Sequence, residues 1–372
     1  MFSQHNCVKI DLSAISYNLN QVKKLVGPDS DIMGVVKSDA YGHGLVQVAR
    51  LLEENGVRSL GVAHLYEAMT LRDNGIKIPI VILCGIRTRE DAEQAIDKAL
   101  TPMVYDMPSV SLLSETASSR KKTLNIHLKI DTGMGRLGIH HSETAEFLSI
   151  VCAKKGLFIE GLASHLSSAN ESDKDFTRQQ VKNFQRAVST GRSMGMELPM
   201  CNLANSAGIM AYKESHFNLV RPGIMLYGGL PSPDFNAPVQ LKTAMTFKGR
   251  VLQIKELTDN TPVSYGRKYY TRGPQKIASI SVGYGDGLPR SLTNIGKVLI
   301  RGEKALIAGT VCMNIITCDV TEIRDIIPGD ETILLGSQGN KAITGDDMAR
   351  WADTISYEIF CSIGQGALKE YM

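Results

Sequence analysis

Basic side chains follow several short apolar runs of this sequence, at places where strands would end. In VVKSDAYGHG, residues 35–44, Lys37 comes directly after a β-branched run, and Lys129, Arg136 and Arg221 lie at or just beyond the ends of later runs. A lone lysine at a strand end is usually a solvated surface residue. Several cations that converge on one mouth repel one another unless an anion or a cofactor neutralises them. The pattern therefore predicts a site for an anionic group.

The run that ends in Arg221 continues into Gly223 and Ile224, with free backbone N–H groups expected at a helix start. A helix start after the eighth strand of a barrel commonly holds a phosphate, and Ser206 could add a hydroxyl donor. A lysine opposite a phosphate site predicts pyridoxal phosphate. The lysine amine would form the Schiff base, the arginine would face the pyridine nitrogen, and the backbone donors would hold the phosphate. A cation-rich pocket also makes the amine easier to deprotonate.

Eight short, β-branched runs would position these residues. They are IMGVV (32–36), SLGVA (59–63), IPIVIL (78–83), PMVY (102–105), LNIHLKI (124–130), FIEGLAS (158–164), MCNLA (200–204) and NLVRP (218–222). Stretches with helical spacing separate them, such as LVQVARLLEENG at 45–56, which Gly56 would end. Eight strand–helix repeats predict a (β/α)8 barrel, with functional side chains at the C-terminal ends of its strands. A doubly wound sheet is the alternative, because a sequence does not show strand order.

The pattern changes after about residue 240. AMTFKGRVLQIKEL, QKIASISVGY, KVLIRGEKALIAG and ETILLG are β-rich, with glycine turns and little helix between them. We therefore expect residues 1–235 to form the barrel and residues 240–372 a mainly β domain, joined by the linker GLPSPDFNAP at 229–238. A first strand near residues 7–11 is a candidate to pack with the second domain.

Composition excludes several classes of protein. The chain has 372 residues, 43% hydrophobic and 21% charged, and its net charge of +3 comes from interspersed signs. No basic patch indicates nucleic acid, no apolar run approaches the roughly 18 residues of a membrane span, and no signal peptide is visible. The seven cysteines fit neither a disulfide framework nor a zinc site. We expect a reduced, cytoplasmic protein without a metal.

Seven motifs, in order, resemble those of alanine racemase. They are VVKSDAYGHG (35–44), HLKIDTGMGRLG (127–138), ANSAG (204–208), VRPGIMLYG (220–228), VSYG (263–266), SVGYGDG (281–287) and WADTISYEI (351–359). The resemblance covers essentially the whole chain. It implies a fold-type III pyridoxal 5'-phosphate enzyme, a barrel followed by a β domain, that acts as a homodimer with shared active sites. It also implies interconversion of L- and D-alanine, which supplies D-alanine for peptidoglycan.

The resemblance further assigns roles, motif by motif. Lys37 would be the Schiff-base lysine and one catalytic base, and Tyr265 from the partner subunit would be the opposite base. Arg136 and the backbone N–H of Met313 would bind the substrate carboxylate. Further cofactor contacts are implied for Tyr41, His165, Asn205, Ser206, Arg221, Gly223, Ile224 and Tyr357.

Supporting roles are implied as well. Lys129, which is carbamylated in many members, would orient Arg136, and Tyr284 would gate the entrance. His165 would link Tyr265 to Arg221.

One departure bears on the substrate. Asn314 stands where the family usually has an aspartate, so a racemase of serine or of a broader range of amino acids is an alternative. A fold-type III decarboxylase is a second alternative, although its cysteine motif and glycine-triplet loop are not found. A cofactor carrier built from the barrel alone is a non-enzymatic alternative, which the β-domain motifs oppose.

Overall fold

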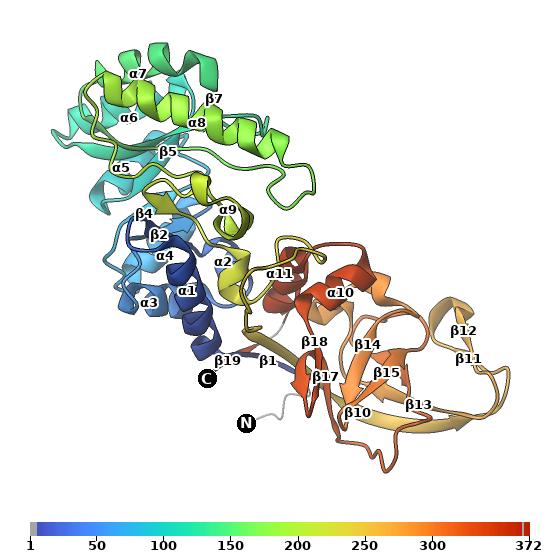
Figure 1. Ribbon diagram of the computed structural model, residues 1–372. Coiled ribbons are helices and arrows are strands. Elements are labelled where there is room, and N and C mark those ends of the chain that lie inside the picture. Colours follow the sequence, from blue (N-terminus) through green and yellow to red (C-terminus); the bar gives the residue numbers. More distant parts are fainter. Residues whose placement is uncertain (1–5, 367) are drawn as a thin grey trace.

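The computed structural model describes residues 6–366 and 368–372, in which seven strands and one bridging residue close into a parallel barrel (Figure 1). The strands are β2 (Asp31–Val35), β3 (Ser59–Val62), β4 (Ile80–Ile82), β5 (Thr101–Val104), β6 (Leu124–Asp131), β8 (Leu157–Ala163) and β9 (Leu219–Val220). β9 pairs with β2, and Asn202 bridges Ala163 and Leu219. The predicted barrel is confirmed, with its seventh strand reduced to Asn202.

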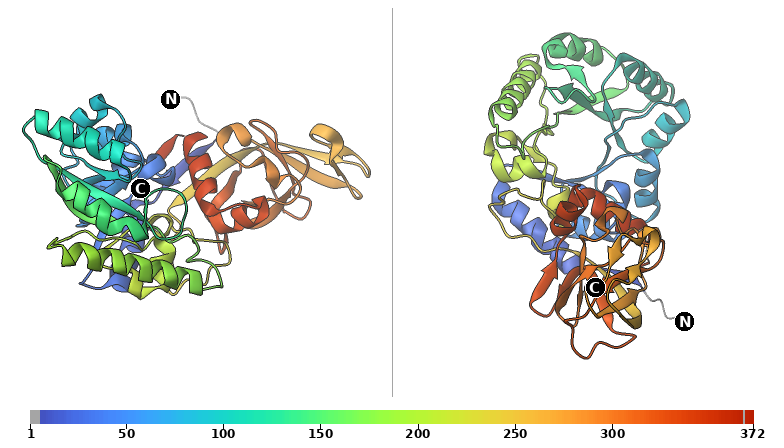
Figure 2. Two further views of the ribbon diagram at one scale, coloured as in Figure 1. Left: turned by 90° about the horizontal axis from the view of Figure 1, so that it is seen from above. Right: turned by 90° about the vertical axis from the view of Figure 1, so that its right-hand side faces the viewer.

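Helices surround the barrel, as the ring in the right-hand view of Figure 2 shows. They are α1 (Leu12–Val26), α2 (Lys37–Tyr41), α3 (Leu45–Glu54), α4 (Leu65–Asp73), α5 (Arg89–Asp97), α6 (Met107–Ser119), α7 (Thr144–Cys152), α8 (Asp175–Ser193) and α9 (Ser206–Ala211). Side-chain caps start several of them; Asp11, for example, accepts from the N–H of Ala14 at 3.0 Å. α3 ends just before Gly56, whose φ is +73°, as predicted.

A nine-stranded, largely antiparallel sheet forms the second part of the molecule. Its order is β18-β17-β14-β15-β16-β13-β10-β1-β19. The strands are β1 (Cys7–Ile10), β10 (Met245–Leu257), β13 (Gln275–Ile280), β14 (Lys297–Ile300), β15 (Glu303–Ile307), β16 (Ile316–Asp319), β17 (Glu331–Gln338), β18 (Lys341–Ile343) and β19 (Lys369–Tyr371). The mainly β second domain is therefore confirmed. The strands nearest the two ends of the chain, β1 and β19, lie side by side in this sheet.

Small elements complete the chain. β7 (Ile139–His140) extends β6, and β11 (Pro262–Val263) pairs with β12 (Tyr269–Tyr270). Helical turns η1–η6 are His141–Glu143, Lys213–Ser215, Ile224–Tyr227, Tyr265–Arg267, Tyr284–Asp286 and Arg290–Leu292. Helices α10 (Gly345–Ala352) and α11 (Ser356–Gly366) lie between the sheet and the barrel (Figure 1). In the described residues, none of the helices is long and apolar enough to cross a membrane.

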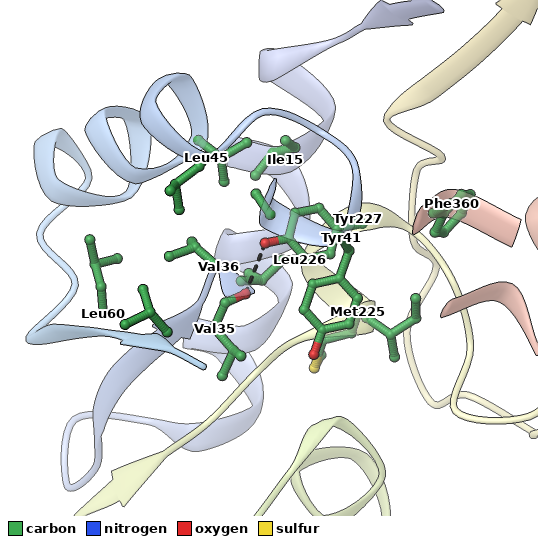
Figure 3. Close-up of a cluster of buried hydrophobic side chains, with 14 of the residues drawn as sticks. Ile15, Val35, Val36, Tyr41, Leu45, Leu60, Met225, Leu226, Tyr227 and Phe360 are labelled. Carbon is green, nitrogen blue, oxygen red and sulfur yellow. Dashed lines mark hydrogen bonds between the residues drawn. The ribbon is translucent and has the colours of Figure 1, made fainter. Parts of the chain in front are cut away.

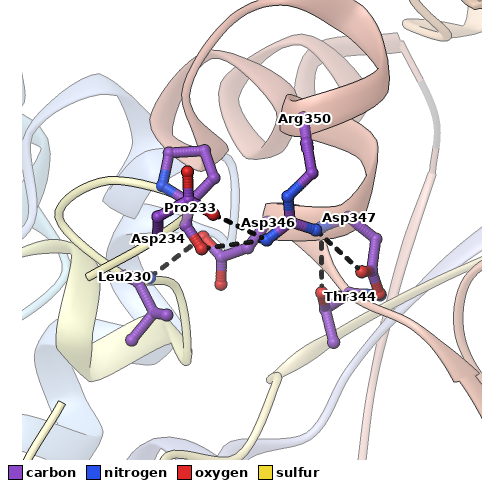
Figure 4. A network of polar contacts seen from close by, with 7 residues as sticks. All are labelled: Leu230, Pro233, Asp234, Thr344, Asp346, Asp347 and Arg350. Carbon is purple, nitrogen blue, oxygen red and sulfur yellow. Dashed lines mark hydrogen bonds and ion pairs between the residues drawn. The ribbon is translucent and has the colours of Figure 1, made fainter. Parts of the chain in front are cut away.

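The segment 229–238 is tied to α10 by polar contacts (Figure 4). Arg350 donates to the carbonyl of Pro233 at 3.0 Å, and the N–H of Leu230 donates to Asp346 at 3.2 Å. Burial raises the pKa of Asp346. The predicted domain boundaries on either side of this segment stay a prediction.

A buried cluster below the barrel mouth joins the two parts (Figure 3). The hydroxyl of Tyr227 donates to the carbonyl of Val35 at 2.8 Å, and the rings of Tyr227 and Tyr41 stack with centroids 4.9 Å apart. Phe360 of α11 packs into the same core. The end of β2, where Lys37 follows, therefore rests on residues of both the barrel and α11.

Candidate active site

A cavity of about 640 Å³ opens at the C-terminal ends of the barrel strands. Eleven of the residues predicted to serve the site line it: Lys37, Tyr41, Lys129, Arg136, His165, Asn205, Ser206, Arg221, Gly223, Ile224 and Tyr357. All except Tyr357, which lies on α11, come from strand ends or from the segments that directly follow them. The structure thus brings together residues from position 37 to position 357.

Seven further lining residues were missed by the sequence reasoning: Val35, Ala63, Leu83, Cys84, Met103, Tyr105 and Leu137. A signal was present, because Ala63, Leu83 and Tyr105 end predicted strands, and Val35, Cys84 and Met103 lie within or directly after such strands. The polar pattern at strand ends does not include them, because most of them are apolar. They give the cavity a largely apolar wall.

Arg221 is fixed from several directions at the end of β9. One terminal nitrogen donates to the carbonyls of Ser164, at 2.6 Å, and Leu203, at 3.2 Å, and lies 3.1 Å from His165 Nδ1. The other donates to the side-chain oxygen of Asn202. Burial, with Arg136 nearby, lowers the pKa of Arg221 to about 10, so it stays protonated at neutral pH. The side chain is a fixed cation under the cavity.

Arg136 follows a loop that Asp131 organises. The carboxylate of Asp131 accepts from the backbone N–H groups of Gly133 at 2.9 Å, Met134 at 2.9 Å and Gly135 at 2.9 Å. Three N–H groups on one carboxylate give the loop a defined shape, because each would otherwise need its own acceptor. The end of β6 therefore determines where Arg136 enters the cavity.

Lys129 and His165 are buried beside these arginines. Burial, followed by the charges of Arg221 and Arg136, lowers the pKa of Lys129 well below its usual value. Burial and Arg221 likewise lower the pKa of His165, so its ring is neutral and its Nδ1 can accept a hydrogen bond from Arg221. Burial first, and the neighbouring positive charges second, therefore favour the uncharged forms of both groups.

The opposite wall is built from Ser206, Gly223, Tyr41 and Tyr357. A side chain on Gly223 would place its Cβ 2.5 Å from the hydroxyl of Tyr41, so any larger residue would displace that tyrosine. Burial raises the pKa values of both tyrosines, which therefore stay hydroxyl donors. The N–H of Gly223 differs from the expectation of a free group, because it donates to the hydroxyl of Ser206 at 3.0 Å.

The other predicted site residues lie elsewhere, on loops of the β domain. Tyr265, Tyr284, Met313 and Asn314 form an exposed group, here called the rim cluster. Tyr265 is 74% and Met313 58% exposed, and no member lines the cavity of the described chain. Their loops are joined by backbone contacts: the N–H of Gly285 donates to the carbonyl of Met313 at 2.7 Å.

The charges of the cavity identify what it can bind. Its described lining residues include Lys37, Lys129, Arg136 and Arg221, and no carboxylate. A group with several negative charges, such as a phosphate together with a carboxylate, would be stabilised by Arg136 and Arg221 and would favour the charged form of Lys129. Lys37 supplies a nucleophilic amine and the apolar wall accepts a ring. The residues that line the cavity therefore fit pyridoxal phosphate together with an amino acid as substrate.

The chain has a closed (β/α)8 barrel followed by a β domain, and a lysine lies among anion-binding groups at the barrel mouth. These features define it as a barrel enzyme with an anion-binding site. Two family profiles match the chain: the alanine racemase N-terminal domain over residues 10–231 and the alanine racemase C-terminal domain over residues 244–371. The alanine racemase of Syntrophobacter fumaroxidans is 43% identical, covering 99% of this chain and 97% of that relative. That of Halothermothrix orenii is 42% identical, covering 98% and 96%.

Solved structures give the same result. The alanine racemase of a D-cycloserine-producing Streptomyces lavendulae matches with a TM-score of 0.94 and 32% identity, covering 100% of this chain and 98% of that one. The Bacillus anthracis alanine racemase with bound L-Ala-P matches with a TM-score of 0.91 and 30% identity, covering 100% and 96%. The chain belongs to the alanine racemase family, and it is an isomerase of that family.

Proposed function

We propose that this protein uses pyridoxal 5'-phosphate to interconvert L-alanine and D-alanine. The observation that carries the proposal is the cavity itself, in which Lys37 lies with Lys129, Arg136 and Arg221 and with no carboxylate among the described lining residues. Membership of the alanine racemase family supports the reaction, and the excess of cations supports the cofactor.

The cofactor would be held by residues that already form one wall. Its phosphate would be bound by Ser206, Tyr41, Tyr357 and the backbone of Gly223 and Ile224. Arg221 would face the pyridine nitrogen, with His165 and Asn205 beside it. Since an arginine keeps its proton, the ring nitrogen would stay unprotonated. The bound cofactor supplies the electron withdrawal that makes the α-proton of an amino acid removable.

Racemisation needs a base on each face of the substrate, because a proton leaves one side and another enters from the opposite side. Lys37 would serve one face. The cavity contains Tyr41 and Tyr357, but their raised pKa values keep both hydroxyls protonated, so neither is available to accept a proton. Tyr265 of the partner subunit would serve the other face, and its exposure in a single chain leaves it available for that role.

The substrate carboxylate would be bound by Arg136 and by the backbone N–H of Met313 of the partner subunit. A carbamate on Lys129 would hold Arg136 in place and would offset part of the positive charge. The lowered pKa of Lys129 supports this modification, because carbon dioxide reacts with the unprotonated amine. Tyr284 would line the entrance.

These roles require a homodimer in which the cavity of one chain meets the rim cluster of the other. We further infer that the protein is cytoplasmic and that its D-alanine enters cell-wall peptidoglycan. No nucleic acid, membrane or metal takes part in the proposed reaction.

The test is chemical trapping followed by a chiral assay. Borohydride reduction of the purified protein should attach the cofactor to Lys37, which peptide mass spectrometry will locate. The same preparation should convert L-alanine and D-alanine to the same final mixture. Trapping at another lysine, or no conversion of either enantiomer, would overturn the proposal.

A further inference from the structure

The residues directly after Lys37 form a left-handed turn. Ser38, Asp39, Ala40 and Tyr41 have φ values of 54°, 55°, 53° and 54°, and none is a glycine. This region is disfavoured for L-residues, which usually enter it singly. Four such residues in succession persist only where the surroundings hold them. Because the turn connects Lys37 to Tyr41, whatever holds it also sets the direction of two cavity side chains.

Groups of the barrel hold the two ends of this turn. The N–H of Ser38 donates to Glu67 at 2.6 Å, and Glu67 is itself buried. His43 Nδ1 lies 2.9 Å from the carbonyl of Tyr41, so that nitrogen carries a proton and donates it. Neither contact reaches the side chain of Asp39, in the middle of the turn.

The side chain of Asp39 is held by the C-terminal strand. One carboxylate oxygen accepts from the N–H of Leu45 at 2.7 Å, and the other accepts from the ammonium group of Lys369 at 2.7 Å. Lys369 is the first residue of β19, the edge strand of the nine-stranded sheet. The lysine side chain is 18% exposed and the aspartate 42%. An ion pair therefore runs from the β domain to the middle of the turn.

Close packing accompanies this ion pair. A Cβ on Gly44 would lie 1.9 Å from the hydroxyl of Tyr371 on β19, and one on Gly42 would lie 2.3 Å from the carbonyl of Phe360 on α11. β19 and α11 thus press against the segment that follows Lys37. Figure 1 shows β19 at the junction of the barrel and the sheet.

We propose that the Asp39–Lys369 ion pair is a latch by which the C-terminal strand holds the left-handed turn and so positions Lys37 and Tyr41 for the cofactor. Lys369 and Asp39 are positioning residues that act through the turn. The inference rests on the proposed function, since the positions of Lys37 and Tyr41 matter to chemistry only with the cofactor bound.

The latch is tested with Lys369→Met, which keeps the aliphatic part of the side chain, and with Asp39→Asn, which keeps an acceptor for Leu45. Equilibrium dialysis of the full-length holoenzyme gives the dissociation constant of pyridoxal 5'-phosphate. Each variant should raise that constant by about fivefold, which corresponds to about 1 kcal/mol, the upper end for a partly exposed ion pair. The double variant should equal either single variant, because the two residues make one contact. Lys369→Arg should restore the wild-type value.

Lys248 offers a matched control. It pairs with Glu331 at 2.7 Å, with side-chain exposures of 20% and 42%, in the same sheet but away from the turn. Lys248→Met should therefore cost similar stability and leave cofactor affinity unchanged. Deuterium uptake of residues 38–44, measured by mass spectrometry with and without cofactor, should rise in Lys369→Met and not in Lys248→Met.

The outcomes distinguish a failure of the latch from a failure of the proposed function. Equal cofactor affinity and equal uptake at 38–44 in Lys369→Met and Lys248→Met would reject the latch. Additive effects of Asp39→Asn and Lys369→Met would also reject it. If the wild-type protein bound no cofactor, the proposed function would fail, while uptake at 38–44 without cofactor would still test whether Lys369 holds the turn.

Discussion

The cavity and the rim cluster both contain residues predicted to serve the reaction, but their surroundings are opposite. Arg221 is 6% exposed and is bonded on both terminal nitrogens, whereas Tyr265 is 74% exposed. Cavity side chains are held by side-chain contacts to several strands. Contacts to the main chain position the rim loops: the hydroxyl of Thr310 donates to the carbonyl of Tyr265 at 2.7 Å.

This difference supports the proposal that one chain holds half of a reaction site. The cavity has two lysines, two arginines and a largely apolar wall, and its two tyrosines, Tyr41 and Tyr357, have raised pKa values. The rim cluster exposes Tyr265, Tyr284 and Met313 together, and a group of large exposed side chains is typical of an interaction surface. A second copy of the chain would bring the two halves into one site.

The largest expected effect is the loss of activity when Lys37 or Tyr265, the two proposed bases, is removed. Lys37→Ala and Tyr265→Ala should each lose activity by about 10⁴-fold or more, because each removes a base. If the two variants are unfolded and refolded together, random pairing in a two-fold dimer makes about half of the dimers hybrids. One site of each hybrid collects both changes and the other collects neither, so roughly a quarter of all sites should regain activity.

The control for this experiment is a mixture of the two variants that is never unfolded, which should stay inactive. Mass spectrometry of intact dimers will show whether hybrids have formed. Hybrids without recovered activity would mean that Lys37 and Tyr265 serve the site of the same chain. The proposal that the cavity of one chain meets the rim cluster of another would then be wrong.

A smaller effect is expected from the charge under the cavity. Arg221→Gln keeps amide donors for the surrounding carbonyls but removes the cation, so kcat for alanine should fall by about 10²-fold, as for loss of one preorganised donor. Arg72 is a matched control, because it also donates to barrel carbonyls, those of Ile76 and Ile78 at 2.8 Å, away from the cavity. Arg72→Gln should lower stability and leave kcat unchanged; equal kcat values for the two variants would exclude a role for the Arg221 charge.

The stability of the protein should also depend on pH, because it buries His43. Burial lowers the pKa of His43 from 6.5 to about 4, so the folded protein holds this ring neutral. The unfolded chain takes up the proton first as pH falls, and this contribution to stability is complete above pH 6.5 and lost toward pH 4. Between pH 7 and pH 5 the loss should be about 2 kcal/mol.

The variant His43→Asn isolates the pH-dependent contribution of this histidine to stability. The asparagine amide can still donate to the turn carbonyls, but it does not titrate. Urea unfolding at both pH values should show that the wild type loses about 2 kcal/mol more than the variant. Parallel pH profiles of the two proteins would show that His43 is not held neutral.

The smallest effect concerns the rim. The amide of Asn314 donates to Asp286 at 3.3 Å, and an aspartate in its place would remove a donor that the hydroxyl of serine could use. Asn314→Asp should therefore raise the ratio of kcat/KM for alanine over serine by about fivefold, the value of one hydrogen bond of about 1 kcal/mol. An unchanged ratio, with both substrates assayed on the same preparation, would make this position neutral for specificity.

Local patterns in the sequence were sufficient for the barrel, the β domain and the cationic mouth. Alternation of β-branched runs and helical spacing follows from side-chain periodicity, and parallel strands bring their C-terminal ends together. Lys37, Lys129 and Arg221 could therefore be grouped before any coordinates. The same rule applies to the apolar lining residues Leu83 and Met103, which also lie at or near the ends of predicted strands.

Other features depend on contacts that no local pattern contains. The left-handed turn after Lys37 uses Ser, Asp, Ala and Tyr, none of which favours positive φ enough to predict it. The turn is held by Lys369, which lies 330 positions away along the chain. The N–H of Gly223 is bonded to Ser206 rather than free, because α9 and η3 approach each other at the barrel mouth. The sequence determined which side chains could do the chemistry, since periodicity and residue type act over a few neighbours. The tertiary structure alone decided which of them share a buried cavity and which stay exposed on the rim, since burial depends on how distant segments pack.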